Sequence, residues 1–161
     1  VLSVSESDDA FYLMNDAFNI AEEYQTPVIV LTDKHIAEGI YTQRPYDQKK
    51  AKISRGQLIT KKSELSKLVS SDRYDPTAKN GISKRWLPSS AAATYCAQGD
   101  EHSADGSVDE SAANAVMQME KRMKKAEAMK QALPEPDLFV IDNGKLKIEN
   151  NNIINFNYKT F

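Results

Sequence analysis

The chain has 161 residues, a hydrophobic fraction of 40%, a charged fraction of 27% and a formal net charge of -2. This length suits one domain with a core, and the near-neutral charge argues against a nucleic-acid partner. No apolar run is long enough to cross a bilayer and no signal-peptide pattern is present, so we expect a cytoplasmic protein with no membrane contact. The single cysteine, Cys96, excludes an internal disulfide and an iron–sulfur cluster held by this chain alone.

The segment from Ser7 to Asp33 predicts a helix, a turn and a strand. Acidic residues begin the helix, apolar residues recur along it at helical spacing, and Pro27 leads into the apolar run Val28–Leu31. Such a run is typical of a strand buried on both faces of a parallel sheet. The rest of the chain offers few partner strands, so we expect this strand to lie at a compromised edge or to pair with another chain. Asp33 follows the strand, where α/β sheets place ligands, but a helix cap is the favoured interpretation.

Residues 40–73 form a connector rich in Lys, Gln, Ser and Thr. We expect a brief strand at Ala51–Ser54 within it, and a short helix from about Ser63 to Val69. The lysines of this region are interpreted as a solvated face, because a nucleic-acid patch needs clustered basic residues with interleaved aromatic residues.

The next loop, residues 72–88, carries turn signals and ends in Arg85, Trp86 and Leu87. The bidentate guanidinium of Arg85 suits a carboxylate or phosphate ligand. An interdomain ion pair beside a packed Trp86 is nevertheless the favoured interpretation, because no phosphate-binding glycine loop accompanies this arginine.

Residues 99–110, GDEHSADGSVDE, hold the densest group of potential metal ligands and follow a predicted strand at Thr94–Ala97. A calcium loop counted from Glu101 would close on Ala112, which has no carboxylate, and zinc would lack a second pair of soft ligands. The favoured interpretation is a tight turn at Asp105–Gly106 between two short strands.

The longest periodic segment, 112–133, predicts a helix. An apolar stripe with methionines at helical spacing is more often ordinary core than an adaptable partner surface, and we expect core for its members: Val116, Met119, Met123 and Ala126.

Beyond this helix, Asn143–Gly144 predicts a tight hairpin between Leu138–Ile141 and Leu146–Ile148. Alternating apolar residues in 154–158 suggest a third strand of a small meander. The asparagine-rich end fits equally well with disorder or with pairing to a second copy of the chain, and the sequence leaves these alternatives open.

Five segments within residues 5–137 resemble, in order and spacing, the α subunit of the 2-oxoacid:ferredoxin oxidoreductases, which are thiamine diphosphate enzymes such as 2-oxoglutarate synthase. One departure follows Pro88, where the family continues with glycines and this chain has Ser89–Ala93. The segments that carry the resemblance are DAFYLMNDAFNIAEEYQTPVIVLTD, DRYDPTAKNGISKRWLP, GDEHSADGSVDE, MEKRMKKAEAM and LPEP.

The resemblance implies an α/β fold in which 1–40 is the end of a pyrimidine-binding type domain, contributing the final helix–strand unit of its parallel sheet. Residues 41–136 are then an irregular connector region with short strands and the long helix 112–133. Residues 137–161 form a divergent tail.

The resemblance also implies a function: oxidative decarboxylation of a 2-oxo acid with coenzyme A, giving an acyl-coenzyme A and carbon dioxide while electrons pass to ferredoxin. Thiamine diphosphate and Mg would belong to the parent complex, and iron–sulfur clusters to partner subunits. A β subunit is the expected partner, with ferredoxin reached through the complex and self-association as a further expectation.

The Y-P-I-T-P segment that carries much of the family's active site has no counterpart here, so no catalytic, cofactor-binding or metal-binding residue is carried over. We therefore expect a partial or truncated α subunit that is inactive alone; the alternative is a non-catalytic interaction or assembly module. Structural or interface roles are expected at the motif positions Asp33, Gly81, Ser83, Arg85, Glu101 and His102.

Overall fold

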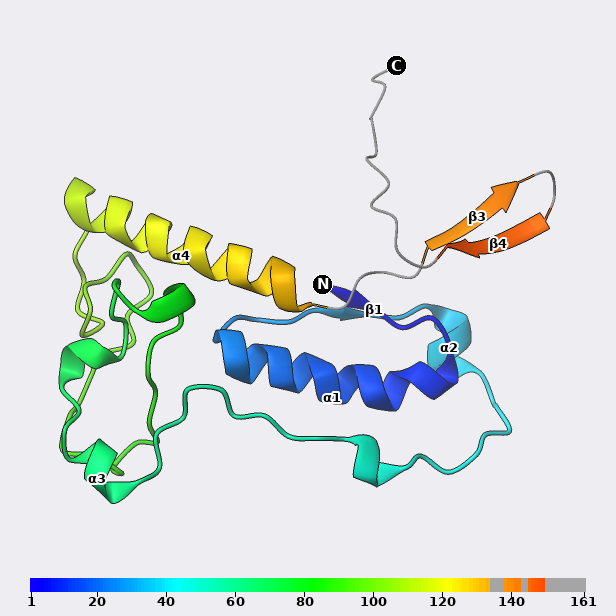
Figure 1. Cartoon of the computed structure of the whole chain (residues 1–161), viewed down its shortest axis with the longest axis horizontal. Coiled ribbons are helices and arrows are strands. Elements are labelled where there is room, and N and C mark those ends of the chain that lie inside the picture. The colour runs from blue at the N-terminus through cyan, green and yellow to red at the C-terminus, as the bar shows by residue number, and fades with distance from the viewer. Residues whose placement is uncertain (134–137, 143–144, 150–161) are drawn as a thin grey trace, which may run out of the picture. The chain divides into compact units, whose positions relative to one another are not determined.

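The computed structural model describes residues 1–133, 138–142 and 145–149. It divides into two compact units, Val1–Met129 and Lys130–Phe161. The fold is α/β. Figure 1 shows a first helix, a short parallel strand pair, a long connector and a second long helix, α4. Within the described residues no helix has the length and apolar character needed to cross a membrane.

The first helix, α1, spans Ser7–Tyr24, with Asp8 and Asp9 in its first turn, where the helix dipole favours negative charge. Two short strands accompany it: β1 (Leu2–Ser3) pairs in parallel with β2 (Val30–Leu31). The predicted helix and strand are thus confirmed, and β1 is an addition that the alternation of apolar residues and serines at the start of the chain could have indicated.

The predicted burial of the Val28–Leu31 run on both faces is wrong. Ile29 is 57% exposed and Leu31 is 52% exposed. The physical reason is that β2 has a single neighbour, β1, in a two-stranded sheet, so no further strand or helix layer covers these side chains. The predicted edge position of this strand is confirmed within the described residues.

After β2 the chain forms the short helix α2 (Lys34–Glu38) and then runs along α1 as an extended connector (Figure 1). The predicted strand at Ala51–Ser54 is wrong, because a side chain takes the place of a partner strand. The Asn19 side chain donates to the Lys52 carbonyl at 2.7 Å and accepts from the Ser54 amide at 2.8 Å. These two bonds satisfy the extended backbone without a ladder.

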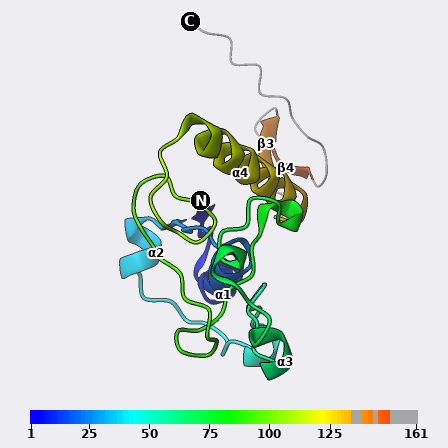
Figure 2. The same cartoon turned by 90° about the vertical axis from the view of Figure 1, so that its left-hand side faces the viewer.

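Several short helices lie in the chain between α2 and α4. The helix predicted at about Ser63 to Val69 is shorter than expected: α3 spans Lys62–Leu65. Three short 3-10 helices also lie between α2 and α4, namely η1 (Gln48–Lys50), η2 (Ser70–Asp72) and η3 (Lys79–Gly81). Figure 2 shows the loops between α3 and α4 gathered at the C-terminal end of α1.

The buried core of the first unit is small and partly polar. Trp86 is 4% exposed, and its indole N–H donates to the Ala93 carbonyl at 3.1 Å. Its ring packs edge-on against the ring of Tyr95, with the ring centroids 5.2 Å apart. The prediction of a packed Trp86 is confirmed. Ser89, which stands where the family has glycine, takes a positive φ of 65°, a conformation that glycine adopts at lower cost. The other buried apolar side chains are Ala17, Tyr24 and Leu65.

The long helix α4 spans Ala112–Ala132, which confirms the helix predicted at 112–133. However, the apolar face that we expected to be buried is exposed, and the polar face is buried. Its polar residues Asn114 and Gln118 are buried, at 3% and 4% exposure, whereas Met119 and Met123 are more than half exposed. The predicted core role of the apolar stripe is therefore wrong.

In the second unit, β3 (Leu138–Asp142) pairs antiparallel with β4 (Lys145–Glu149), with Asp142 opposite Lys145. This antiparallel register confirms the predicted pairing of the two strands. The predicted third strand at 154–158 lies outside the described residues.

Candidate functional site

Three of the predicted motif positions meet in one pocket. Gly81, Ser83 and His102 line it together with residues from the C-terminal end of α1 and from the buried face of α4. We call it the basic pocket. Its volume is about 210 Å³, and the polar and charged side chains that define it are Gln25, Arg73, Gln118, Lys121, Arg122 and Lys125.

Gln25 organises one wall of the basic pocket. It ends α1 in the left-handed conformation, with φ of 49°. Its side chain donates to the Ser83 carbonyl at 2.5 Å and accepts from Arg73 Nη1 at 2.8 Å, and its own carbonyl accepts from Lys125 Nζ at 3.2 Å. One glutamine thus joins the end of α1 to the loop at Ser83 and to α4.

Aromatic rings form a second wall around Arg73. Its guanidinium lies 4.5 Å from the centroid of the Tyr74 ring and 5.3 Å from that of Tyr95. The ring of His102 lies 4.3 Å from that of Tyr74. Ring faces attract a cation, so these contacts hold the arginine in place without neutralising its charge.

The α4 wall of the basic pocket concentrates positive charge. Burial, followed by repulsion from Lys125 and Arg73, lowers the pKa of Lys121 to about 8, against a weaker opposing effect of Asp75. Burial likewise lowers the pKa of Lys125. A lysine pKa this far below its ordinary value shows that the charged form is held at a cost in the folded chain.

Glu101 neutralises only one of the pocket cations. Its carboxylate accepts two hydrogen bonds from Arg122, at 2.7 and 3.3 Å. This pairing lowers the pKa of Glu101 and raises the pKa of Arg122. Within the described residues no carboxylate forms an ion pair with Arg73, Lys121 or Lys125.

Asp33 and Arg85, like Glu101, are not among the residues that line the basic pocket. Asp33 caps α2, accepting a hydrogen bond from the Ile36 amide at 2.8 Å. Arg85 forms an ion pair with Glu22 of α1 and donates to the Arg55 carbonyl at 3.0 Å. The predicted ion pair of Arg85 is therefore present. Arg85 and Glu22 both belong to the first unit.

The acidic segment 99–110 forms the predicted tight turn. His102 and Val108 pair as an antiparallel bridge, and the Ser103 amide donates to the Ser107 carbonyl at 2.9 Å. Hydrogen bonds from Ser103 and Ser107 lower the pKa of Asp105 to about 2. Among the described residues there is no group of three or more His, Cys, Asp or Glu side chains arranged to hold a metal ion. The carboxylate of Asp105 thus serves the turn itself.

Sequence reasoning missed the residues that give the basic pocket its charge. Arg73 lies at the end of the segment interpreted as a connector, and the predicted core face of the 112–133 helix is its apolar stripe and not its lysines. A signal was present, because Asn114, Gln118, Lys121 and Lys125 recur at helical spacing and form a polar stripe as regular as the apolar one. Periodicity gives two faces of a helix but does not say which face the protein covers.

Comparison with known proteins identifies the family. The family described as pyruvate flavodoxin/ferredoxin oxidoreductase, thiamine diphosphate-binding, matches residues 1–132. The chain is 37% identical over 138 residues to "2-oxoacid:ferredoxin oxidoreductase 1, subunit alpha" of Sulfurisphaera tokodaii, covering 84% of this chain and 21% of that protein. It is also 37% identical over 138 residues to the "2-oxoacid:ferredoxin oxidoreductase subunit alpha" of a Sulfolobus species, covering 84% of this chain and 20% of that protein.

A third relative, from Aeropyrum pernix, carries the name "2-oxoacid:ferredoxin oxidoreductase 1, subunit alpha" and is 33% identical over 135 residues, covering 84% of this chain and 20% of that protein. The chain thus spans about a fifth of the length of the curated relatives it matches. Because the family match extends over most of its residues, the chain belongs to the pyruvate flavodoxin/ferredoxin oxidoreductase, thiamine diphosphate-binding family.

Proposed function

We propose that the chain is part of the α subunit of a 2-oxoacid:ferredoxin oxidoreductase. The observation that carries the proposal is the family match over residues 1–132, together with three relatives named as α subunits of such enzymes. The activity proposed for the parent enzyme is oxidative decarboxylation of a 2-oxo acid with coenzyme A, giving an acyl-coenzyme A and carbon dioxide, with ferredoxin accepting the electrons.

The family name implies thiamine diphosphate, which we expect together with Mg. Among the described residues, we ask whether the side chains of the basic pocket fit this ion. Mg²⁺ needs oxygen ligands, carboxylates among them. No carboxylate of the described residues lines this pocket, and the neighbouring Glu101 carboxylate is paired to Arg122, so the donor set does not fit a metal. We therefore assign no metal-binding role to this pocket, and we propose no catalytic or thiamine diphosphate-binding role for the described residues. In this proposal thiamine diphosphate and Mg belong to the parent complex and iron–sulfur clusters to partner subunits.

The motif positions then have structural or interface roles. Gly81 and Ser83 hold the loop against α4 and α1, and Arg85 ties it to Glu22. Glu101 and His102 hold the turn against α4, since the Glu101 carboxylate binds Arg122 and the His102 carbonyl accepts from the Asn114 side chain at 3.0 Å. Asp33 caps α2.

We propose that the chain divides as the family resemblance implies, into the end of a pyrimidine-binding type domain at 1–40, a connector region at 41–136 and a tail at 137–161.

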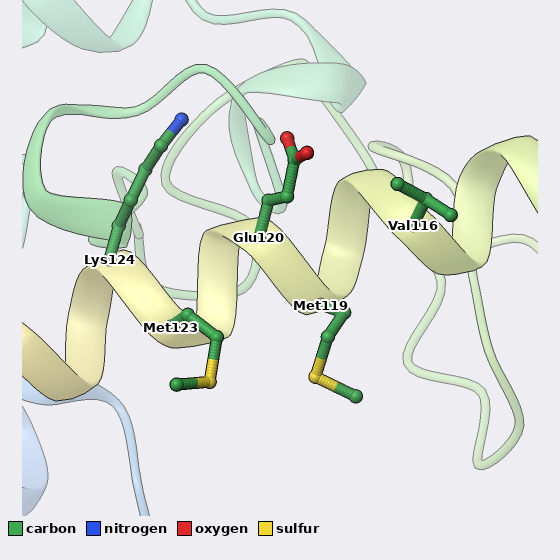
Figure 3. A pocket seen from close by; sticks show the side chains of 5 residues that line it. All are labelled: Val116, Met119, Glu120, Met123 and Lys124. Carbon is green, nitrogen blue, oxygen red and sulfur yellow. The ribbon is translucent and has the colours of Figure 1, made fainter.

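The surface proposed to contact the rest of the enzyme is the exposed apolar face of α4. It forms an open groove of about 370 Å³. Figure 3 shows the Met119 and Met123 side chains projecting side by side from this helix, with Val116 one turn away. Methionine side chains adapt readily to a partner surface. We propose the β subunit as the occupant, and Glu120 and Lys124 provide a charged border to the same groove.

Two assays test the proposal. The purified 161-residue chain should not reduce a viologen dye in the presence of 2-oxo acid and coenzyme A, because no Y-P-I-T-P segment occurs in the sequence tested. Immobilised chain should retain the β subunit of such an enzyme, and Met119→Glu with Met123→Glu should weaken retention at least about tenfold by placing charges in an apolar contact. Val69→Lys is the matched control, since Val69 is similarly exposed but lies outside α4.

Turnover by the chain alone would contradict the claim that it is inactive. Loss of β-subunit binding in the Val69→Lys control as well would contradict the assignment of α4 as the contact.

The alternative function is a non-catalytic interaction or assembly module derived from the same subunit, and the exposed face of α4 is the observation that favours it. Recovery of other proteins without any β subunit would support this alternative. Both versions place the chain in the cytoplasm, which cell fractionation followed by immunodetection would test.

A further inference from the structure

The basic pocket contains hydrogen-bond donors without acceptors. Gln118 is 4% exposed, and its side-chain Nε2 has no hydrogen-bond partner. Arg73 Nε is also buried and without a partner. An unpaired buried donor costs free energy comparable to a lost hydrogen bond, so two of them lining one pocket indicate an absent acceptor.

Three cations of the same pocket have no ion pair within the described residues, namely Arg73, Lys121 and Lys125, although Asp75 acts on Lys121 without pairing with it. Arg73 is held by the Gln25 amide and by aromatic faces, and Lys125 donates to the Gln25 carbonyl. Lys121 lies with its Nζ 5.9 Å from the centroid of the Tyr74 ring. None of these contacts supplies a negative charge. Like charges brought together under partial burial repel one another, and an anion placed among them would reverse that effect.

We propose that the basic pocket binds the phosphate group of a ligand, with Arg73, Lys121 and Lys125 supplying charge and the Gln118 side chain donating a hydrogen bond. This site is independent of the proposed catalytic activity. The chemical class is a phosphate monoester or a diphosphate, free or as part of a larger molecule.

Phosphate is favoured over a carboxylate because of the number of donors and charges. A phosphate monoester carries a charge of about -1.5 to -2 near neutral pH and offers three strong acceptor oxygens, whereas a carboxylate carries a single charge and two oxygens. Arginine and glutamine donors arranged around one cavity match the larger number of oxygens. The volume of about 210 Å³ holds a phosphate group with several waters, since a water occupies about 30 Å³ in the liquid.

The pKa of Lys121 supports the same conclusion. The charged groups that act on it are Lys125 and Arg122 of its own helix and Arg73 and Asp75 of the loop after η2. Tyr74, His102 and Tyr24 line the same pocket. Of the charged groups, Lys125, Arg73 and Arg122 lower its pKa and only Asp75 is identified as raising it. A bound phosphate would raise the pKa of Lys121, because an opposite charge stabilises the ammonium form.

The test uses the 161-residue chain and thermal unfolding near neutral pH. Inorganic phosphate and pyrophosphate are titrated against sodium chloride and sodium acetate at matched ionic strength. We expect the phosphates to raise the unfolding temperature, because a ligand that binds only the folded state stabilises it. Binding measured by calorimetry should weaken at least about tenfold in Lys121→Gln, the usual effect of losing one charge-assisted hydrogen bond.

The effect of Lys121→Gln on the unfolding temperature should change sign when phosphate is added. This change distinguishes a lysine that binds a ligand from one with a purely structural role. Without phosphate, Lys121→Gln should unfold at a higher temperature than the unmodified chain, because it removes a repelled, partly buried charge. With phosphate, that order should reverse. Lys124→Gln is the matched control, because it removes the same charge from an exposed position of the same helix and should leave both phosphate binding and this order unchanged.

Two outcomes would overturn the proposal: no stabilisation by phosphate beyond that by chloride, or equal stabilisation by acetate. Undiminished binding in both Lys121→Gln and Lys125→Gln would also overturn it. Circular dichroism establishes that each variant is folded, and Lys125→Gln replaces Lys121→Gln if the latter fails to fold.

Discussion

At the scale of single residues, the ion pair between Arg85 and Glu22 shows how a loop is held to a helix. The two side chains are 20% and 28% exposed, so they are more shielded than an ordinary surface pair. Partial shielding strengthens the attraction, but removing one partner leaves the other poorly solvated. The pair therefore stabilises the chain chiefly by keeping both charges satisfied.

A double-mutant cycle with Arg85→Ala and Glu22→Ala should give a coupling free energy of about 1 kcal/mol, measured by urea unfolding. The pair Lys61–Glu64 is the control, because its side chains are 77% and 48% exposed. Its coupling should not exceed about 0.5 kcal/mol. Equal coupling in the two pairs would contradict a structural role for Arg85.

Lys121 should make the stability of the chain depend on pH. Its folded-state pKa of about 8 lies below the ordinary value of 10.5, so between these values the unfolded chain binds more protons than the folded chain. Stability therefore rises with pH across this window, and the penalty for the charged lysine is fully present below about 8. Burial is the largest cause of the lowered pKa of Lys121, and repulsion from Lys125, Arg73 and Arg122 adds to it.

The measurement is the unfolding temperature of the unmodified chain and of Lys121→Gln, without phosphate, from neutral pH upward. The difference between the two proteins should shrink as pH rises through this window, whereas Lys124→Gln should run parallel to the unmodified chain. A constant difference would show that the lysine is not perturbed in the folded state.

At the scale of elements, α4 lies close to the η3 turn because residue 81 is glycine. Gly81 has φ of 68°, and a Cβ atom there would lie 2.3 Å from the Lys121 carbonyl oxygen and 2.9 Å from the Lys125 amide nitrogen. Both atoms belong to the backbone of α4 and cannot move independently. The separation between the turn and the helix is thus set by the absence of one side chain.

Gly81→Ala should destabilise the chain by about 2–4 kcal/mol, combining a strained left-handed conformation with overpacking against backbone. Gly99→Ala is the control, because a Cβ atom there meets nothing within 4 Å. It should change the free energy of unfolding by no more than about 0.5 kcal/mol. Urea unfolding of the two variants checks both values, and similar destabilisation in both would contradict the close approach of α4.

How far the sequence predicts the elements depends on which interactions form them. The helices at Ser7–Tyr24 and Ala112–Ala132 and the hairpin at Leu138–Glu149 follow from local periodicity and turn chemistry, and they were predictable. The extended segment at Ala51–Ser54 was not, because its partner is the Asn19 side chain, more than thirty residues away. No local pattern shows that an asparagine on a helix will replace a strand.

The candidate site was predictable only in part for a similar reason. His102 and Ser83 belong to motifs that stand out in the sequence, and they line the basic pocket. Arg73 and Lys121 also belong to segments that carry the family resemblance, but no role is predicted for either, because the sequence does not show that the fold brings their charges together. The exposure of Met119 was not predictable, because a helix burying its polar face reverses the usual partition of hydrophobic residues.

At the scale of the whole molecule, exposed apolar side chains are spread over several elements. They occur on α1 at Phe18, on β2 at Ile29 and on α4 at Val116, Met119 and Met123. Single exposed apolar side chains are normal on a protein surface, whereas Val116, Met119 and Met123 line one open groove on α4. Among the described residues, the face of α4 is therefore the apolar surface best suited to a partner.

We expect the purified chain to self-associate as its concentration rises, because the apolar face of α4 is uncovered. Met119→Glu with Met123→Glu should shift the chain toward monomer while its helix content stays unchanged. Size-exclusion chromatography with light scattering checks the mass, and circular dichroism checks the helix content. Concentration-independent monomer in the unmodified chain would contradict this expectation, and Val69→Lys should leave the association unchanged.

The connector after α2 contains more chain than it needs to span α1. Tyr46 stacks on Phe11 near the start of α1, and Gly56 passes within contact distance of Glu23 near its end. From Phe11 to Glu23 a helix advances about 18 Å, whereas the chain from Tyr46 to Gly56 could extend about 33 Å. The η1 turn at Gln48–Lys50 takes up part of the excess, because a 3-10 helix advances only about 2.0 Å per residue. Insertions within η1 would therefore enlarge a bulge, while a deletion of a few residues there would draw the chain straight before it lost either attachment.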